Sequence, residues 1–151
     1  MPRHLLVSAL RWWTILALYG ITNGAFRRTV LLPVMTEEQA HRLSCLTLMV
    51  LMLAVSWFFV RRFEPRCRAE WIRVGLLWLV CTVAFEFAFG RLVVGSGWDT
   101  LLADYDLARG RLWLLVLLTV LAGPCVAAMV RDTRGNRHVA ATPPDGTSSR
   151  G

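Results

Sequence analysis

The sequence contains four long apolar blocks separated by clusters of charged residues. The blocks cover residues 5–26, 43–60, 74–94 and 112–130. A helix of about 17 to 25 residues can cross the hydrocarbon core of a bilayer. The blocks lack the regular alternation of apolar and polar residues that is typical of half-buried strands. The pattern therefore predicts an all-α integral membrane protein, a four-helix bundle, in residues 1–130.

The positive charge lies at the ends of these blocks. The formal net charge is +7, all 17 basic residues are arginine, and 56% of the 151 residues are hydrophobic. A basic soluble protein would suggest a nucleic-acid partner. Because these arginines flank apolar blocks, we expect them to face the anionic surface of the lipid bilayer instead, and we expect no nucleic-acid binding.

The arginines also predict an orientation. If consecutive blocks cross in opposite directions, eleven arginines lie on the side of the two termini and six lie on the other side. Cytoplasmic loops carry the larger number of basic residues, so we expect both termini in the cytoplasm. The first block has no clear small-residue cleavage motif after it and is followed by Arg27 and Arg28. We therefore expect it to remain in the protein as a span.

One carboxylate lies inside an apolar block. Glu86 is the only charged residue between Val74 and Gly90. A charge inside a span costs about 2.5 to 3.5 kcal/mol at the helix centre and less near an end, so Glu86 should have a partner. The partner that we expect first is Arg27, which follows the first block, and the second is Arg111, which precedes the fourth.

Other polar residues lie at the same end of the predicted bundle. Asn23 lies at about the depth of Glu86, and Thr82 lies one turn before Glu86 on the same helix face. The predicted polar cluster consists of Glu86, Arg27, Asn23, Arg111, Arg91 and Thr82. In a structural hypothesis, Glu86 pairs across helices and fixes the bundle. In a functional hypothesis it handles a proton or a ligand, and in a third it is protonated and bonds to a backbone carbonyl.

Two segments outside the apolar blocks have different expected structures. In residues 98–109, aspartates alternate with apolar residues at helical spacing, which predicts a short amphipathic helix on the membrane surface. Its apolar residues are Trp98, Leu101, Leu102 and Tyr105. Residues 131–151 are rich in Arg, Pro, Gly and Ser, so we expect a disordered cytoplasmic tail.

Small and aromatic residues predict how the spans pack. The spacing of Gly20 with Gly24, and of Gly123 with Ala127, allows another helix to approach closely. Pro124 is expected to kink the fourth span. Tryptophans near the block ends are expected to anchor the spans at the bilayer surface; they are Trp12, Trp13, Trp57, Trp98 and Trp113.

Sequence motifs of enzymes are missing. The sequence has no Gly-rich phosphate loop, no G-x-S-x-G and no H-E-x-x-H, and its three histidines lie in separate segments. The four cysteines form no C-x-x-C pair, so we expect single thiols and neither a metal nor a cofactor.

Three function classes follow from these features. The first is an interaction or accessory protein that binds itself or other membrane proteins. The second is a small transporter or channel that uses Glu86. The third is a membrane-embedded enzyme on lipid-like substrates, with arginines that bind phosphate. The absence of catalytic motifs favours the first class and makes an enzyme the less expected one.

Three stretches carry a resemblance to known proteins: "NGAFRR", "AFEFAFG" and "LLADYDLARGRLWLLVLL". With them the chain resembles, from about Trp12 to Ala127, a group of small four-span bacterial membrane proteins without an assigned activity. The most specific part runs from Leu101 to Leu118. The resemblance implies a location in the bacterial inner membrane, and it assigns a role to no residue.

Overall fold

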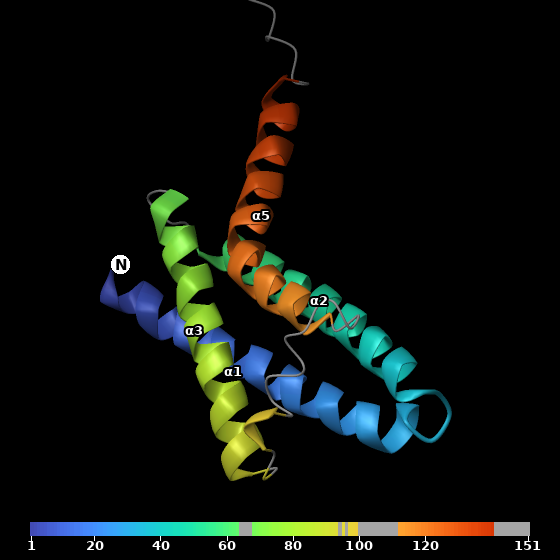
Figure 1. Ribbon diagram of the computed structural model, residues 1–151. Coiled ribbons are helices and arrows are strands. Elements are labelled where there is room, and N and C mark those ends of the chain that lie inside the picture. The colour runs from blue at the N-terminus through green and yellow to red at the C-terminus, as the bar shows by residue number, and fades with distance from the viewer. Residues whose placement is uncertain (64–67, 94, 96, 100–111, 141–151) are drawn as a thin grey trace, which may run out of the picture.

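Four long helices form the fold. The computed structural model describes residues 1–63, 68–93, 95, 97–99 and 112–140, and of residues 134–140 it describes the backbone alone. Within these ranges there is no strand, and each of the four helices is long and apolar enough to cross a membrane, so the all-α prediction is confirmed (Figure 1). The elements are α1 (Arg3–Phe26), the π-helical turn η1 (Arg27–Leu31), α2 (Glu37–Arg62), α3 (Arg68–Leu92) and α5 (Trp113–Ala140).

The helices are longer than the apolar blocks. α2 begins at Glu37 because Thr36 caps it: the Thr36 hydroxyl accepts a hydrogen bond from the Gln39 amide at 3.3 Å, and the Gln39 side chain accepts one from the Thr36 amide at 3.2 Å. This reciprocal capping box satisfies two backbone donors, and the acidic residues Glu37 and Glu38 favour the same helix end. The capping residues are recognisable in the stretch T-E-E-Q.

The fourth helix continues past the predicted end of its span. α5 runs to Ala140, so the structure has a helical backbone over residues 131–140, where the sequence predicts a disordered tail. Extending an existing helix adds one hydrogen bond for each residue that becomes ordered, and the sequence has no proline between Pro124 and Pro143 to stop it. Residues 141–151 of the predicted tail lie outside the described residues.

Helix α5 is the centre of the packing. Its contacts with α2 and α3 are the most extensive between elements, and α1 lies against α2 and α3. Figure 1 shows α3 running across α1 at a steep angle, so the four helices are not parallel. As a result, the far end of α1 lies beside the start of α2 and away from the end of α3.

An aromatic core joins the beginning of α1, the end of α2 and the beginning of α3. Phe59 and Trp78 are both fully buried, with ring centroids 5.2 Å apart. The Trp71 ring lies 6.0 Å from Phe59, and the Trp12 ring lies 5.9 Å from it. The Trp78 indole donates a hydrogen bond to the Ala9 carbonyl at 2.8 Å, which gives this buried N–H group a partner. Trp12 therefore packs in the core besides lying near a span end.

Two glycines permit the closest helix contacts. A Cβ atom on Gly75 would lie 2.1 Å from the Leu121 carbonyl oxygen of α5. A Cβ atom on Gly123 would lie 2.5 Å from the Ser56 hydroxyl of α2, which confirms the predicted close approach at Gly123. The sequence does not predict the close contact at Gly75, because this contact depends on which helix faces Gly75.

Two further packing predictions concern Pro124 in α5 and the glycine pair Gly20 and Gly24 in α1. Pro124 is fully buried inside α5, and the helix changes direction along its length in Figure 1, as expected for a helix that contains a proline. In contrast, a Cβ atom on Gly20 or Gly24 would meet nothing within 4 Å. No described helix of the chain therefore makes the close contact that the spacing of this pair allows.

Candidate functional site

The polar residues that were predicted to form one cluster lie in two separate places. Asn23 and Arg27 contact the beginning of α2, whereas Thr82 and Glu86 contact tryptophans of α1 and α5. The split follows from the divergence of α1 and α3. The sequence gives the position of a residue along its own helix, but it does not give the distance between the ends of two different helices.

The first group, which we term the α1–α2 junction, joins antiparallel helices through matched polar pairs. The Asn23 amide donates hydrogen bonds to the Ser44 carbonyl at 3.1 Å and to the Ser44 hydroxyl at 2.6 Å. One turn later the Arg27 guanidinium donates to His41 Nδ1 at 2.9 Å. Because the chain runs in opposite directions on the two sides, Arg27, four residues after Asn23 and the first residue of η1, meets His41, three residues before Ser44 on α2.

His41 connects this junction to Cys45. His41 and Cys45 are both 3% exposed, and His41 Nε2 lies 3.5 Å from the Cys45 sulfur. Arginine can only donate, so Nδ1 accepts, and the hydrogen of a neutral ring is assigned to Nε2, which then donates to the sulfur. The sequence predicted neither residue as part of the cluster. The signal was their spacing of four, which places both on one helix face.

The same spacing is typical of metal ligands, but the hydrogen bonds oppose that role here. A metal ion would need the lone pair of Nε2, and the Arg27 contact keeps a hydrogen on that nitrogen. In the described part of the chain, no group of three His, Cys, Asp or Glu side chains is placed to hold a metal ion. Cys45, Cys81 and Cys125 form no disulfide, and Cys67 lies outside the described residues.

The second group lies where α3 faces α1 and α5. The Trp113 indole, in the first turn of α5, donates to the Glu86 carboxylate at 2.7 Å. The Trp13 indole donates to the Thr82 hydroxyl at 3.2 Å, and the Trp13 ring meets Phe85 edge-on, with centroids 6.0 Å apart. Trp13 and Trp113 were expected only as surface anchors, and here they act as hydrogen-bond donors between helices.

The expected ion pair between Glu86 and Arg27 is wrong. Arg27 bonds to His41 because α1 ends beside the start of α2. Arg111, the second expected partner, lies outside the described residues. Arg91 is exposed at the end of α3. Half-buried Glu86 therefore has an indole as its neighbour in place of the expected guanidinium of Arg27.

The predicted surface helix is described only at its start. Trp98 and Asp99 are helical, and the Trp98 ring lies 6.0 Å from the Phe87 ring. Leu101, Leu102 and Tyr105 lie outside the described residues, so the predicted amphipathic helix stays a prediction.

These contacts join most of the described candidate residues to other helices, in agreement with the structural hypothesis. Asn23, Arg27, Thr82 and Glu86 each bond to a group on another helix, and such bonds contribute on average about 0.6 kcal/mol each to helix association in a membrane. Comparisons with protein family models, with curated proteins and with solved structures find no match for the chain.

Proposed function

We propose that the protein is a multi-pass protein of the bacterial inner membrane that acts by binding other membrane proteins or itself. The observation that carries this proposal is the uneven burial of the four spans. In the most apolar 18-residue stretch of each span, 44% of α2 and 39% of the α5 segment are buried, but only 17% of α1 and 17% of α3. The contacts of the polar residues support the proposal, because they join helices of the bundle. The thiol that lies beside an imidazole, Cys45 beside His41, is only 3% exposed, so a substrate does not reach it.

α1 is the helix best suited to receive a partner. Ile21, beside the glycine pair, is 38% exposed, and no atom of the described residues lies within 4 Å of a Cβ placed on Gly20 or Gly24. Pairs of small residues at this spacing let a second helix approach closely in a bilayer. Since no described part of the chain covers this pair, we infer that a helix of another molecule packs there. We also propose that both termini lie in the cytoplasm, because the distribution of the arginines favours this orientation.

Site-specific crosslinking tests the proposal. A photo-crosslinking amino acid at Ile21, which lies beside the glycine pair, should give a discrete product in native membranes. The product should be lost in Gly20→Ile and Gly24→Ile, because the added side chains prevent close approach. Thr22→Ile is the matched control on the opposite face of α1 and should keep it. The docking role of α1 would be refuted if no crosslinked product formed, or if the product persisted in both glycine variants.

Glu86 supports a second candidate function, a small transporter or channel. Its carboxylate lies inside a span and is only half-buried, and such residues often mark ion or proton pathways. Ion flux into proteoliposomes that is abolished by Glu86→Gln, and kept by the Trp113→Phe control, would favour this function. Turnover of a phospholipid headgroup by the purified protein would favour an enzyme on lipid-like substrates.

A further inference from the structure

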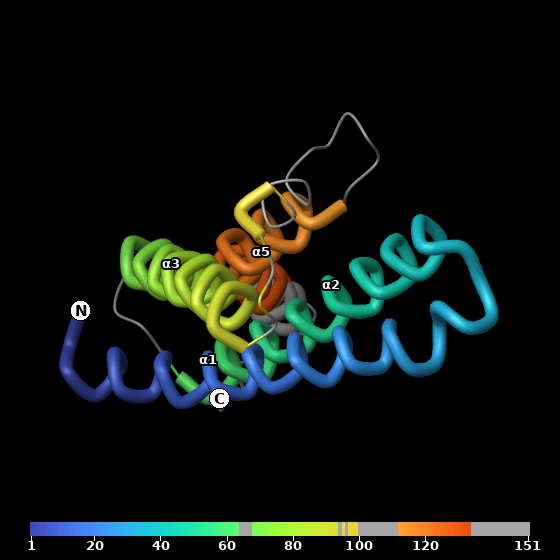
Figure 2. The backbone as a smooth tube through the Cα atoms, turned by 60° about the horizontal axis from the view of Figure 1, so that its bottom comes forward, coloured from blue at the N-terminus to red at the C-terminus, as the bar shows by residue number. Residues whose placement is uncertain are grey.

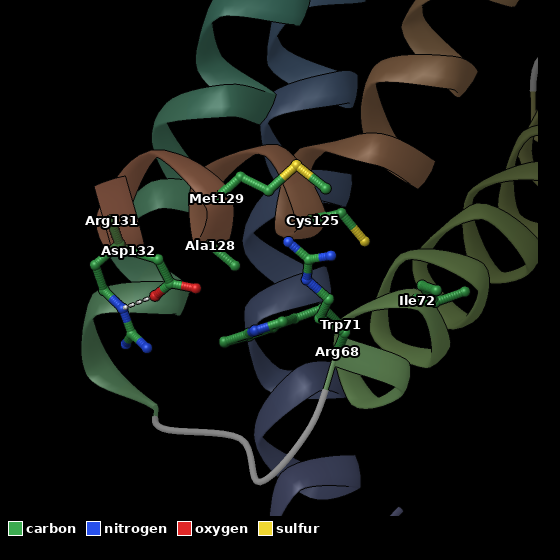
Figure 3. Close-up of a pocket in the computed structure, with 8 residues that line it drawn as sticks. All are labelled: Arg68, Trp71, Ile72, Cys125, Ala128, Met129, Arg131 and Asp132. Carbon is green, nitrogen blue, oxygen red and sulfur yellow. Dashed lines mark ion pairs between the residues drawn. The ribbon is translucent and has the colours of Figure 1, made fainter. Parts of the chain in front are cut away.

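An open cavity lies where the beginning of α3 meets the end of α5 (Figure 3). Its volume is about 320 Å³. It combines a polar wall with an apolar one, and the residues that matter here are Arg68, Arg131, Asp132, Trp71, Ile72 and Met129. Two arginines against one aspartate give this lining an excess of positive charge.

The two arginines differ in what they already contact. Arg131 is held in place, since its NH1 group donates to the Val60 carbonyl at 3.0 Å and its Nε lies 3.8 Å from the Asp132 carboxylate. Figure 3 shows Arg68 reaching from α3 toward α5, into the space above the Trp71 ring. Arg68 is exposed and has no hydrogen bond or ion pair with any other residue that the structure describes. Its guanidinium is therefore available to an anion.

We propose that this cavity binds an anionic phospholipid, with the phosphate between Arg68 and Arg131 and an acyl chain along Ile72 and Met129. Guanidinium groups match phosphate oxygens with paired hydrogen bonds. Ile72 is 56% exposed and Met129 is 50% exposed, so the apolar wall continues onto the outer surface of the bundle. A free phosphate would use the arginines alone, and this apolar wall is why we assign a lipid.

The position along the helices agrees with a lipid headgroup. Arg68 is the first residue of α3, and Arg131 lies near the end of the apolar segment Trp113–Thr133. Both guanidinium groups therefore lie at the polar boundary of the spans, where phospholipid phosphates are found. This inference uses a different surface from that of α1, so it does not depend on the proposed protein–protein role.

Lipid binding to the purified, delipidated full chain in detergent tests the proposal. Fluorescent phosphatidylglycerol should bind about tenfold more tightly than phosphatidylcholine with the same acyl chains, because the headgroup of the first has a net negative charge. Arg68→Ala should lower the affinity for phosphatidylglycerol about tenfold, and Arg68→Lys should lower it less, since it keeps the charge. Arg68 has no described partner, so these variants should fold.

Arg61→Ala is the matched control. Arg61 also lies at this end of the bundle but outside the cavity, with its guanidinium 5.8 Å from the Trp57 ring. Its replacement should change the affinity by about threefold at most, as expected for the general attraction of a basic surface. Equal losses in Arg61→Ala and Arg68→Ala would overturn the proposal, because they would show surface attraction without a site.

Two further variants separate a lipid from free phosphate. Met129→Trp should reduce phosphatidylglycerol binding by filling the apolar wall without a change of charge, and Asp132→Asn should increase it by removing a negative charge. Inorganic phosphate should not compete at concentrations comparable to those of the lipid. Competition by inorganic phosphate, together with unchanged binding in Met129→Trp, would overturn the lipid assignment in favour of a free anion.

Discussion

At the scale of single residues, polar side chains inside the spans decide which helix ends meet. Arg27 and His41 form the most specific of these contacts, because a guanidinium must lie opposite the accepting nitrogen of a buried ring. Hydrogen bonds that involve a charged group contribute about 1.5 to 3 kcal/mol to stability. Losing either partner removes this charged hydrogen bond from a site next to the core.

We therefore predict that Arg27→Ala and His41→Phe each lower the stability of the protein in detergent by roughly 1 to 3 kcal/mol. The double variant should lose less than the sum of the two, since both substitutions remove one shared interaction. Thermal unfolding of the purified chain measures the effect. Arg28→Ala is the control, because Arg28 is the exposed neighbour of Arg27 and should have little influence.

A second prediction concerns the partner of Glu86. Trp113→Phe removes the indole donor and should destabilise the bundle by about 1 kcal/mol, and its effect should not add fully to that of Glu86→Ala. Arg27→Ala and Glu86→Ala should be additive, because these two residues lie in different groups. Coupling between Arg27 and Glu86 of the size seen for Trp113 would contradict the arrangement described here.

At the scale of helices, backbone approach depends on a few glycines. Gly75 brings α3 against the backbone of α5, and Gly123 brings α5 against a side chain of α2. A backbone carbonyl cannot move aside cheaply, whereas a side chain can rotate. The Ser56 hydroxyl that faces Gly123 is buried and has no hydrogen-bond partner among the described residues, so no bond holds it in place.

Alanine at Gly75 should therefore be more harmful than alanine at Gly123. Overpacking typically costs about 1 to 3 kcal/mol, and we expect Gly75→Ala at the upper end of this range and Gly123→Ala below it. Gly20→Ala is the matched control on α1 and should leave stability unchanged or slightly raised, since alanine favours helix and nothing lies nearby. Thermal unfolding of the three variants ranks them. An equal loss at Gly20 and Gly75 would contradict the described α3–α5 contact.

At the scale of the whole molecule, the alternating direction of four spans divides the surface into two ends. One end has the start of α1, the end of α2 and the start of α3, with the aromatic core and the arginine-lined cavity. The opposite end has η1 and the α1–α2 junction. Figure 2 shows the junction end of α1 and α2 extending away from α3 and α5.

The orientation of these two ends can be measured with single cysteines. In a background without the four native cysteines, we place one cysteine at Val34, which is 74% exposed between η1 and α2, and another at the exposed Arg62. A membrane-impermeant thiol reagent applied from the periplasmic side should label Val34→Cys and leave Arg62→Cys unlabelled. The reverse pattern would place the termini outside the cytoplasm. Labelling after membrane permeabilisation is the control for reactivity.

The sequence by itself determined the four apolar helices, because uninterrupted apolar blocks of membrane-spanning length have few alternatives. It also contained the local signals for the start of α2 at Thr36 and for a proline inside α5. These features depend on residues that are neighbours along the chain, so periodicity and capping rules are sufficient to find them.

Only the tertiary structure decided which polar groups meet. The sequence predicts Glu86 and Arg27 at the same end of the bundle, but the crossing of α1 and α3 separates them, so that Arg27 bonds to His41 and Glu86 to Trp113. The role of Gly75 and the arginine-lined cavity likewise arise from helices that meet only after folding. Depth in the membrane follows from position along one helix, whereas a contact also requires the rotation and crossing angle of two helices. These are set by the packing of side chains across the bundle.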